Sequence, residues 1–434
     1  MIERTDGHLA TSSMDLVADT AGGLHLFYDS IPADGQADAG QLNYMHWDGN
    51  AWSTPVDIFA AGEMGYIRHP RAVIDSKGSV HLVWVGSGNT LYYSTAHALR
   101  AGDAREWAAP VQLTDGFDEP AIVAGEDSKL YLATSSIARQ ALLFLRSDDF
   151  GRTWSFPSTI FAALGSETPS EVGLALDNAG RFHAVWTGHT LPTGDPLTGV
   201  YYSRSTDGGA TWSVPYQLDD AYHGDINVVT NESDGVHVAW SSNIGGDGKF
   251  HAWSSDGGET WSNAHQLSRT GGQSGLPSLS VDSNGTTHIM FSQAYATEWT
   301  NGQTAVLVDV ASPDRRAAAT SIERAVMAIT DGNQLHVVFE DDFEQLMHVT
   351  RILDSPSLQS EALPTPTGND PITVGSSPQE AQIGATVTPG APVARVDTLQ
   401  QYQGSSANAI LIGVAVSAIS ILLMLLFYRR TRTR

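Results

Sequence analysis

Charged and aromatic side chains recur at one place in this chain, in the short loops that lead into a series of predicted strands. These side chains are Tyr66, Arg68, His69, Asp118, Glu119, Glu171, Tyr222, His223, Asp225, Arg269, Glu323 and Arg324. An arginine guanidinium offers a fork of donors that matches the two oxygens of a carboxylate. Carboxyl and imidazole groups can hold or transfer a proton. What these groups can do together depends on the elements that position them.

The elements are hairpins that repeat about every 50 residues. The clearest copy runs from Pro70 to Trp84 as a short apolar strand, a turn and a second apolar strand that ends in an aromatic residue. Related copies cover residues 16–28, 122–133, 174–186, 228–240, 279–291 and 326–339. A third strand follows in most copies, and then a Trp-containing segment. Four strands per unit at a fixed period predict an all-β fold, a β-propeller of six or seven four-stranded blades, and we count seven hairpins.

Three copies of the pattern Ser-x-Asp-x-Gly-x-Thr-Trp follow the third strand, at residues 147–154, 205–212 and 254–261. Asp and Gly form a tight turn, because Gly accepts the positive φ that other residues avoid. The pattern resembles the Asp-box, or bacterial neuraminidase repeat, of the sialidase superfamily. The resemblance covers residues from about 10 to 353. It implies a propeller that carries the boxes on its outer rim, while the ligand site lies at the opposite mouth of the ring.

The resemblance also implies a set of catalytic residues. Sialidases bind a substrate carboxylate with three arginines and use a Tyr nucleophile, which a Glu activates, with an Asp as acid/base. Residues 66–70 are similar to the motif of the first arginine, and the order of the chain gives the remaining roles. The implied catalytic residues are Arg68, Arg269 and Arg324 as the clamp, Glu171 as the activator and Asp118 as the acid/base, and the implied substrate-binding residues are Tyr66, His69, Tyr222, Asp225 and Tyr295. The nucleophile should follow the last arginine, yet no Tyr lies between Arg324 and Tyr402, so Tyr295 would serve only if Arg269 were the last.

Two functions remain open at this point. The first is a non-catalytic module that binds a glycan or a protein at the mouth of the ring, which explains the missing Tyr and the extra repeat. The second is an exo-sialidase type of glycoside hydrolase, which removes terminal sialic acids from glycoconjugates and has the Asp-box pattern in its favour. We expect the binding module and keep the hydrolase as the alternative.

Composition narrows the set of partners. The formal net charge is -25, which argues against nucleic-acid binding because that requires clustered basic residues. The chain has no cysteine, so disulfides and thiolate metal sites are excluded. One histidine recurs at the same place in the second strand of six hairpins, and equivalent positions on separate blades lie too far apart to bind one ion. We therefore expect structural histidines, no metal site and no cofactor.

The C-terminal part differs in character. Residues 8–353 form the predicted propeller, and residues 354–408 are rich in Pro, Ser and Thr, as is typical of an extended stalk. Residues 409–428 are uncharged and apolar over a length that matches a bilayer, and four arginines occur within residues 429–434. This arrangement predicts a single-pass protein of the cell membrane with its propeller outside. Outward orientation normally requires an export signal, and the polar first residues do not resemble one. Either the sequence lacks its true start, which we expect, or the protein is tail-anchored with its propeller inside the cell.

Overall fold

The computed structural model describes residues 8–9, 13–32, 40–60, 65–126, 129–163, 167–190, 199–220, 224–242, 248–268, 276–291, 294–297, 306–308, 323–340 and 346–366. The chain divides into one unit of residues 1–381 and a second of residues 382–434. The predicted membrane span and basic tail lie outside the described residues. Within the described part of the chain, no helix is both long enough and apolar enough to cross a membrane.

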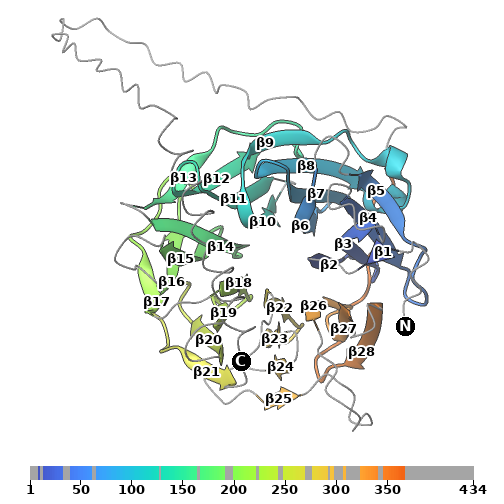
Figure 1. Ribbon diagram of the computed structural model, residues 1–434. Coiled ribbons are helices and arrows are strands. Elements are labelled where there is room, and N and C mark those ends of the chain that lie inside the picture. The colour runs from blue at the N-terminus through green and yellow to red at the C-terminus, as the bar shows by residue number, and fades with distance from the viewer. Residues whose placement is uncertain are drawn as a thin grey trace, which may run out of the picture. The chain divides into compact units, whose positions relative to one another are not determined.

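The described residues form seven antiparallel sheets around a central opening, which we number blades 1 to 7 in chain order (Figure 1). Blade 1 contains β1 (His8–Leu9), β2 (Met14–Ala18), β3 (Leu24–Pro32), β4 (Gln41–Trp47) and β5 (Val56–Ala60). Blade 2 contains β6 (Ile67–Ile74), β7 (Ser79–Gly86), β8 (Thr90–His97), the short 3-10 helices η2 (Ala98–Arg100) and η3 (Ala104–Glu106), and β9 (Val111–Asp115). Blade 3 contains β10 (Phe117–Ala124), β11 (Leu130–Ser136), β12 (Ala141–Ser147) and β13 (Ser158–Ala162).

Blade 4 contains β14 (Glu167–Leu176), β15 (Phe182–Thr190), β16 (Gly199–Ser205) and β17 (Tyr216–Asp219). Blade 5 contains β18 (Gly224–Thr230), β19 (Val236–Ser242), β20 (Gly248–Ser254) and β21 (His265–Ser268). Blade 6 contains β22 (Ser278–Val281), β23 (Thr287–Phe291), β24 (Ala294–Thr297) and β25 (Val306–Val308), and blade 7 contains β26 (Glu323–Thr330), β27 (Gln334–Glu340) and β28 (Leu346–Ile352).

The innermost strands close the ring. Each of β2, β6, β10, β14, β18 and β22 contacts the innermost strand of the next blade, and β26 contacts β2. Six sheets have four or five strands, and the seventh has three described strands. The predicted propeller is therefore confirmed, and each of the seven hairpins read from the sequence corresponds to one sheet.

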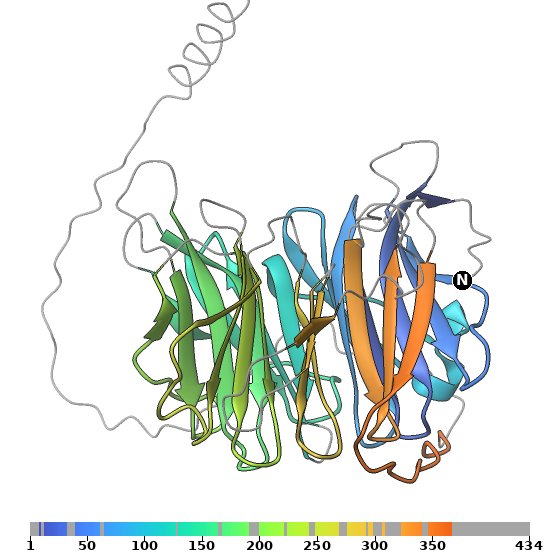
Figure 2. The same cartoon turned by 90° about the horizontal axis from the view of Figure 1, so that it is seen from below.

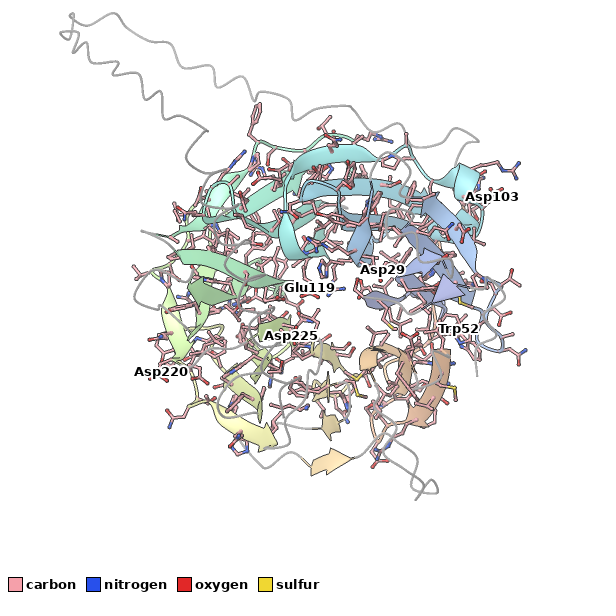
Figure 3. The ribbon with its side chains drawn as sticks, viewed as in Figure 1. Asp29, Trp52, Asp103, Glu119, Asp220 and Asp225 are labelled. Atoms are coloured by element: carbon pink, nitrogen blue, oxygen red, sulfur yellow. The ribbon has the colours of Figure 1, made fainter. Side chains whose placement is uncertain are left out.

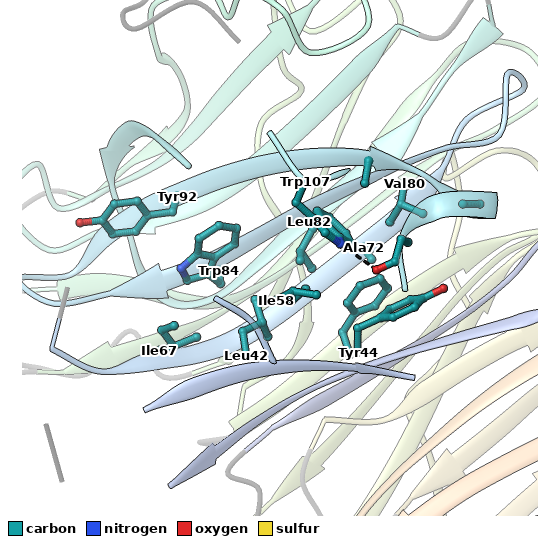
Figure 4. Close-up of a cluster of buried hydrophobic side chains, with 14 residues drawn as sticks. Leu42, Tyr44, Ile58, Ile67, Ala72, Val80, Leu82, Trp84, Tyr92 and Trp107 are labelled. Atoms are coloured by element: carbon teal, nitrogen blue, oxygen red, sulfur yellow. Dashed lines mark hydrogen bonds between the residues drawn. The ribbon is translucent and has the colours of Figure 1, made fainter. Parts of the chain in front are cut away.

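Blades are held together by side chains that are buried between neighbouring sheets. In Figure 4, Leu42 and Ile58 of blade 1 lie in one cluster with Trp84 of blade 2. Trp84 is buried and stacks on Phe59 of blade 1, with 4.8 Å between ring centroids. Most residues of the second strands are buried, as the β7 pattern shows, because each blade has a neighbour on both faces. This accounts for the nearly continuous apolar runs in the sequence.

An aspartate and a histidine recur together inside four blades. The pairs are Asp19 with His25, Asp75 with His81, Asp177 with His183, and Asp282 with His288. In each pair, Oδ1 of the aspartate accepts backbone N–H groups two and four residues further along the turn. Its Oδ2 lies 3.1–3.2 Å from the histidine Nε2. These four histidines are thus buried in the second strands and contact the aspartates of the hairpin turns, which supports their structural interpretation.

The three Asp-boxes have the same internal hydrogen bonds. In the box at residues 205–212, Asp207 accepts the backbone N–H and the hydroxyl of Thr211, and Ser205 Oγ accepts the N–H of Gly209. The box tryptophans pack on the preceding blade, with Trp212 5.5 Å from Phe144 between ring centroids. The boxes join the third and fourth strands, on the side of the ring where the first hairpin turns also lie (Figure 2). Their predicted place on the outer rim is confirmed.

Residues 353–366 run across this same side of the ring (Figure 2). Leu358 donates its N–H to the carbonyl of Asp331 in blade 7, and Glu361 donates to Thr20 in blade 1. Leu363 packs against the cluster between blades 1 and 2. The first part of the predicted stalk is therefore attached to the propeller and links its last blade to its first. The remainder of the stalk lies outside the described residues.

We predict that the boxes contribute to stability and not to ligand binding. Trp212→Ala should lower the free energy of unfolding by about 1–3 kcal/mol, because it removes a contact between blades 3 and 4. Denaturant unfolding followed by circular dichroism measures this change. The folded fraction of the variant should keep the ligand affinity of the wild type, and a variant that folds normally but binds nothing would place the ligand site on the box side.

Candidate functional site

The innermost strands are irregular at the end where the chain enters them. The pairing with the second strand shifts between Arg68 and Arg71 in β6, between Ser170 and Gly173 in β14, and between Gly224 and Ile226 in β18. At each shift one residue has a positive φ, which is 55° for His69, 49° for Glu171 and 45° for Asp225. Such a backbone costs energy for a residue other than Gly, and it is common at functional sites. The irregularity changes the direction of one side chain per blade at the mouth.

Three carboxyl groups converge at this mouth from three consecutive blades. They belong to Glu119 of β10, Glu171 of β14 and Asp225 of β18, and one oxygen of each lies within 4.8 Å of the others. Figure 3 shows Glu119 and Asp225 beside the central opening. Glu119 and Glu171 are hydrogen-bonded to each other, so one of the two carboxyls must carry a proton. Below we call these three residues the carboxyl cluster.

A histidine and an arginine lie beside Glu119. The Oε1 atom of Glu119 is 3.3 Å from His69 Nδ1 and 3.6 Å from Arg71 Nη2. The backbone N–H of His69 donates to Ser13 Oγ of blade 1, which fixes the strained residue. Burial opposes ionisation of Glu119, but the hydrogen bonds with Glu171 and His69 and the charges of His69 and Arg71 outweigh it. They hold the pKa of this carboxyl well below its usual range.

Asp225 has the opposite tendency. Burial, together with the charge of Glu119, raises the pKa of Asp225 to about 6, although the Ser241 hydroxyl donates to its Oδ2 at 3.1 Å. The cluster therefore contains an ionised carboxylate next to a carboxyl that exchanges its proton close to neutral pH. Because the two carboxyls differ in proton affinity, the mouth can both donate and accept hydrogen bonds. Unequal proton affinities of neighbouring carboxyls are also typical of an acid/base pair. Three oxygens at this spacing could also hold a hard cation.

Tyr66 and Arg68 form a second group, at the edge of blade 2. The Arg68 guanidinium lies over the Tyr66 ring, 4.6 Å from its centroid. Both side chains donate to Asn89 Oδ1, at 3.1 Å from Arg68 Nη2 and 2.9 Å from the Tyr66 hydroxyl. An aromatic ring, a guanidinium and an amide held together in this way are suited to contact with a sugar ring or an anionic group.

The structure brings together three of the predicted site residues, His69, Glu171 and Asp225, and it places Tyr66 and Arg68 in the group on blade 2. The backbones of Asp118, Tyr295 and Arg324 lie in β10, β24 and β26, but their side chains are outside the described residues, as are Tyr222 and Arg269 entirely. The predicted arginine clamp and Tyr nucleophile thus remain predictions.

Sequence reasoning placed Glu119 in an entering loop but gave it no role, and it did not single out Arg71 or Asn89. A role for Glu119 could have been inferred, because Glu119-Pro120 occupies the same place in its repeat as His69-Pro70. The contribution of Arg71 follows from the strand irregularity beside it, for which the sequence has no comparable pattern.

A closed ring of antiparallel sheets with Asp-box turns and polar groups at its mouth is typical of Asp-box β-propellers. The sequence profile of the BNR repeat-like domain family matches residues 22–289, more than half of the chain, and the chain therefore belongs to this family. It is a propeller of the sialidase superfamily. No curated protein matches the sequence.

Several solved structures are similar to this one. The BP39L lectin from Burkholderia pseudomallei is 13% identical with a TM-score of 0.55, over 81% of this chain and 99% of the lectin. An ulvan lyase of polysaccharide lyase family 25 is 13% identical with a TM-score of 0.54, over 80% of this chain and 95% of the lyase. A protein of unknown function from Dyadobacter fermentans is 15% identical with a TM-score of 0.52, over 70% of this chain and 95% of that one. At these identities the likeness shows the fold alone.

We predict a pH dependence of stability from Asp225. Its pKa rises from 3.8 to about 6 on folding, so the stability that its protonated form contributes is present below pH 3.8 and is lost as the pH rises to about 6. Asp225→Asn stays neutral, so over this interval it should gain about 2 kcal/mol in unfolding free energy relative to wild type. Urea unfolding at several pH values measures the difference. The matched control is Asp220→Asn on the exposed rim, which should follow the wild type, and equal slopes for all three proteins would contradict the prediction.

Proposed function

We propose that this protein is a glycan-binding propeller, which holds its ligand at the mouth of the ring. The observation that carries the proposal is the carboxyl cluster with His69, in which groups from four blade edges meet around one point. Ionised carboxylates accept hydrogen bonds from adjacent sugar hydroxyls, and a protonated carboxyl or an imidazole can donate one. Ligand sites in such rings favour the place where several blades converge. The shared fold of the BP39L lectin is consistent with this function.

The charge of the mouth bears on the kind of glycan. Glu119 is held ionised and Asp225 loses its proton above about pH 6, so at neutral pH the cluster repels anionic groups. The formal net charge of -25 acts in the same direction. We therefore favour neutral sugars as ligands of the cluster. An acidic sugar would need Arg68, at the edge of blade 2, to offset this field.

A glycoside hydrolase is the second candidate, because the carboxyls of the cluster have unequal affinities for a proton. Retaining glycosidases use two carboxyls about 5–5.5 Å apart, one as acid and one ionised. Oxygens within 4.8 Å, with Asp225 protonated below about pH 6 beside an ionised Glu119, have a similar arrangement. The exo-sialidase form of this candidate requires in addition that Arg68, Arg269 and Arg324 converge on a carboxylate.

We expect binding without turnover. Wild-type protein should be retained on an immobilised glycan array, and Glu119→Gln should lower the affinity at least about tenfold, because it removes the charge that orders His69 and Glu171. Asp225→Asn should weaken binding less at pH 5, where Asp225 is already neutral, than at pH 7. Asp220→Asn is the control and should bind as wild type. Equal affinities for all of these proteins would exclude the mouth as the binding site.

The same proteins separate the binder from the enzyme. A fluorogenic sialoside and neutral aryl glycosides should release no fluorophore above background. If wild type turns over the sialoside, and both Arg68→Lys and Glu171→Gln lose that activity, the hydrolase replaces the binding module. The Arg68→Lys change is informative because a lysine point charge cannot reproduce the guanidinium fork.

We also propose that the propeller lies outside the cell and is held there by residues 409–428. The uncharged span and the four arginines after it support this orientation. Protease added to intact cells should cut the stalk and release a soluble propeller, which immunoblotting detects. A cut within residues 367–408 should leave the ring intact, since residues 353–366 are bound to it. Protection of the stalk until the cells are lysed would show the opposite orientation.

A further inference from the structure

A second convergence of polar side chains lies at the other end of β2, in the first hairpin turn of blade 1. Asp19, His25 and His46 each offer one ligand atom there, and these atoms lie within 4.8 Å of one another. Asp19 and His25 form the pair that recurs in other blades, with 3.1 Å between Oδ2 and Nε2. His46 is on β4, directly across from His25 in the strand register, and the two rings are 4.9 Å apart.

Blade 1 differs from the equivalent blades at two positions around this pair. The residue across from the pair's histidine is His46 in blade 1, but Thr95 in blade 2 and Arg204 in blade 4. The residue four positions after the aspartate, whose N–H binds Oδ1, is Gly23 in blade 1, but Ser79 in blade 2 and Arg181 in blade 4. Blade 1 thus has an additional side chain that can bind a metal, His46, and it has no side chain at position 23 beside the aspartate.

Gly23 leaves room at the point that the three ligand atoms surround. A Cβ at this position would lie 2.6 Å from Asp19 Oδ2 and 2.9 Å from His46 Nε2. In blade 4 the corresponding space holds a positive charge, because Arg181 Nε donates to Asp177 Oδ2 at 2.5 Å. The space beside the Asp19 carboxylate in blade 1 corresponds to the space that the Arg181 guanidinium occupies in blade 4. No described side chain fills it in blade 1, so a cation can be placed there.

We propose that Asp19, His25 and His46 bind a divalent transition-metal ion of the zinc class. Two imidazole nitrogens and one carboxylate oxygen are ligands that zinc prefers, and water can complete a tetrahedron. Calcium and magnesium select sites made of oxygen and should bind poorly. The site lies at Thr20, the residue to which the C-terminal segment binds through Glu361. A bound ion would therefore connect β3 and β4 to the turn at which the ring is closed.

Binding must rearrange the hydrogen bonds of His25. The Tyr44 hydroxyl lies 2.7 Å from His25 Nδ1, and Nε2 faces the Asp19 carboxylate, so the neutral ring carries its proton on Nε2. An ion bonded to both Nε2 and Oδ2 takes the place of that proton, which moves to Nδ1, where the Tyr44 oxygen accepts it. The imidazole stays neutral, so it releases no net proton.

The test is titration of the untagged, chelator-treated full chain with ZnCl2 in a calorimeter. One equivalent should bind. Zinc should raise the unfolding temperature, whereas CaCl2 at the same concentration should not. A wild-type protein that binds no zinc, or that binds calcium equally well, would overturn the proposal.

Two variants locate the site, and each introduces the residue that blade 2 has at the same place. His46→Thr removes one ligand, and Gly23→Ser fills the space beside Asp19, where the backbone conformation tolerates a side chain. Both should lose the zinc isotherm while they keep the circular dichroism of wild type. His97→Thr, a histidine on the same side of blade 2, is the control and should bind one equivalent. Unchanged zinc binding by either folded variant would refute the assignment. If one variant fails to fold, the other still decides.

Discussion

Ring closure is the constraint on which the rest of this structure depends. Each sheet is buried on both faces, so no blade can be stable without two neighbours, and the contact of β26 with β2 closes the sequence of blades. Trp84, Trp186 and Trp240 occupy equivalent buried places in these interfaces. Residues 353–366 add a second connection between the last blade and the first, through backbone hydrogen bonds on the side of the turns. A propeller that ended at residue 352 would have only the side chains of its terminal blades to hold it closed.

The closed ring also creates the mouth. It brings the entering ends of β10, β14 and β18 together although they are about 50 residues apart in the chain. The strand irregularities then turn Glu171 and Asp225 toward the same space at the cost of an unfavourable backbone. The packing of the blades offsets the energetic cost of this strained backbone. This explains why the carboxyl groups can be held at distances where their charges repel. The unequal proton affinities of Glu119 and Asp225 are a consequence of this enforced proximity.

Much of this could be predicted from the sequence, because the repeats encode it locally. The hairpins and the boxes depend on residues close together in the chain, and the structure confirms them. The sequence predicted His69, Glu171 and Asp225 from their place at the start of a recurrent strand, and the structure brings these three residues together. Arg68 illustrates what could not be predicted, since its stacking on Tyr66 depends on Asn89, which follows the second strand and has no repeat pattern to mark it.

The positions at which one repeat departs from the others carry the most information about function. In the middle of the strands the copies are alike, because every blade packs against a neighbouring blade on each face. At the entering ends, the equivalent positions hold His69, Glu119, Glu171 and Asp225, and their differences produce the polarity of the mouth. At the opposite ends, Gly23 and His46 stand where blade 2 has Ser79 and Thr95 and blade 4 has Arg181 and Arg204. The mouth and the hairpin-turn side of the ring therefore depend on the same repeated core. The core fixes the backbone, and single side chains at the two ends of the strands can differ from blade to blade.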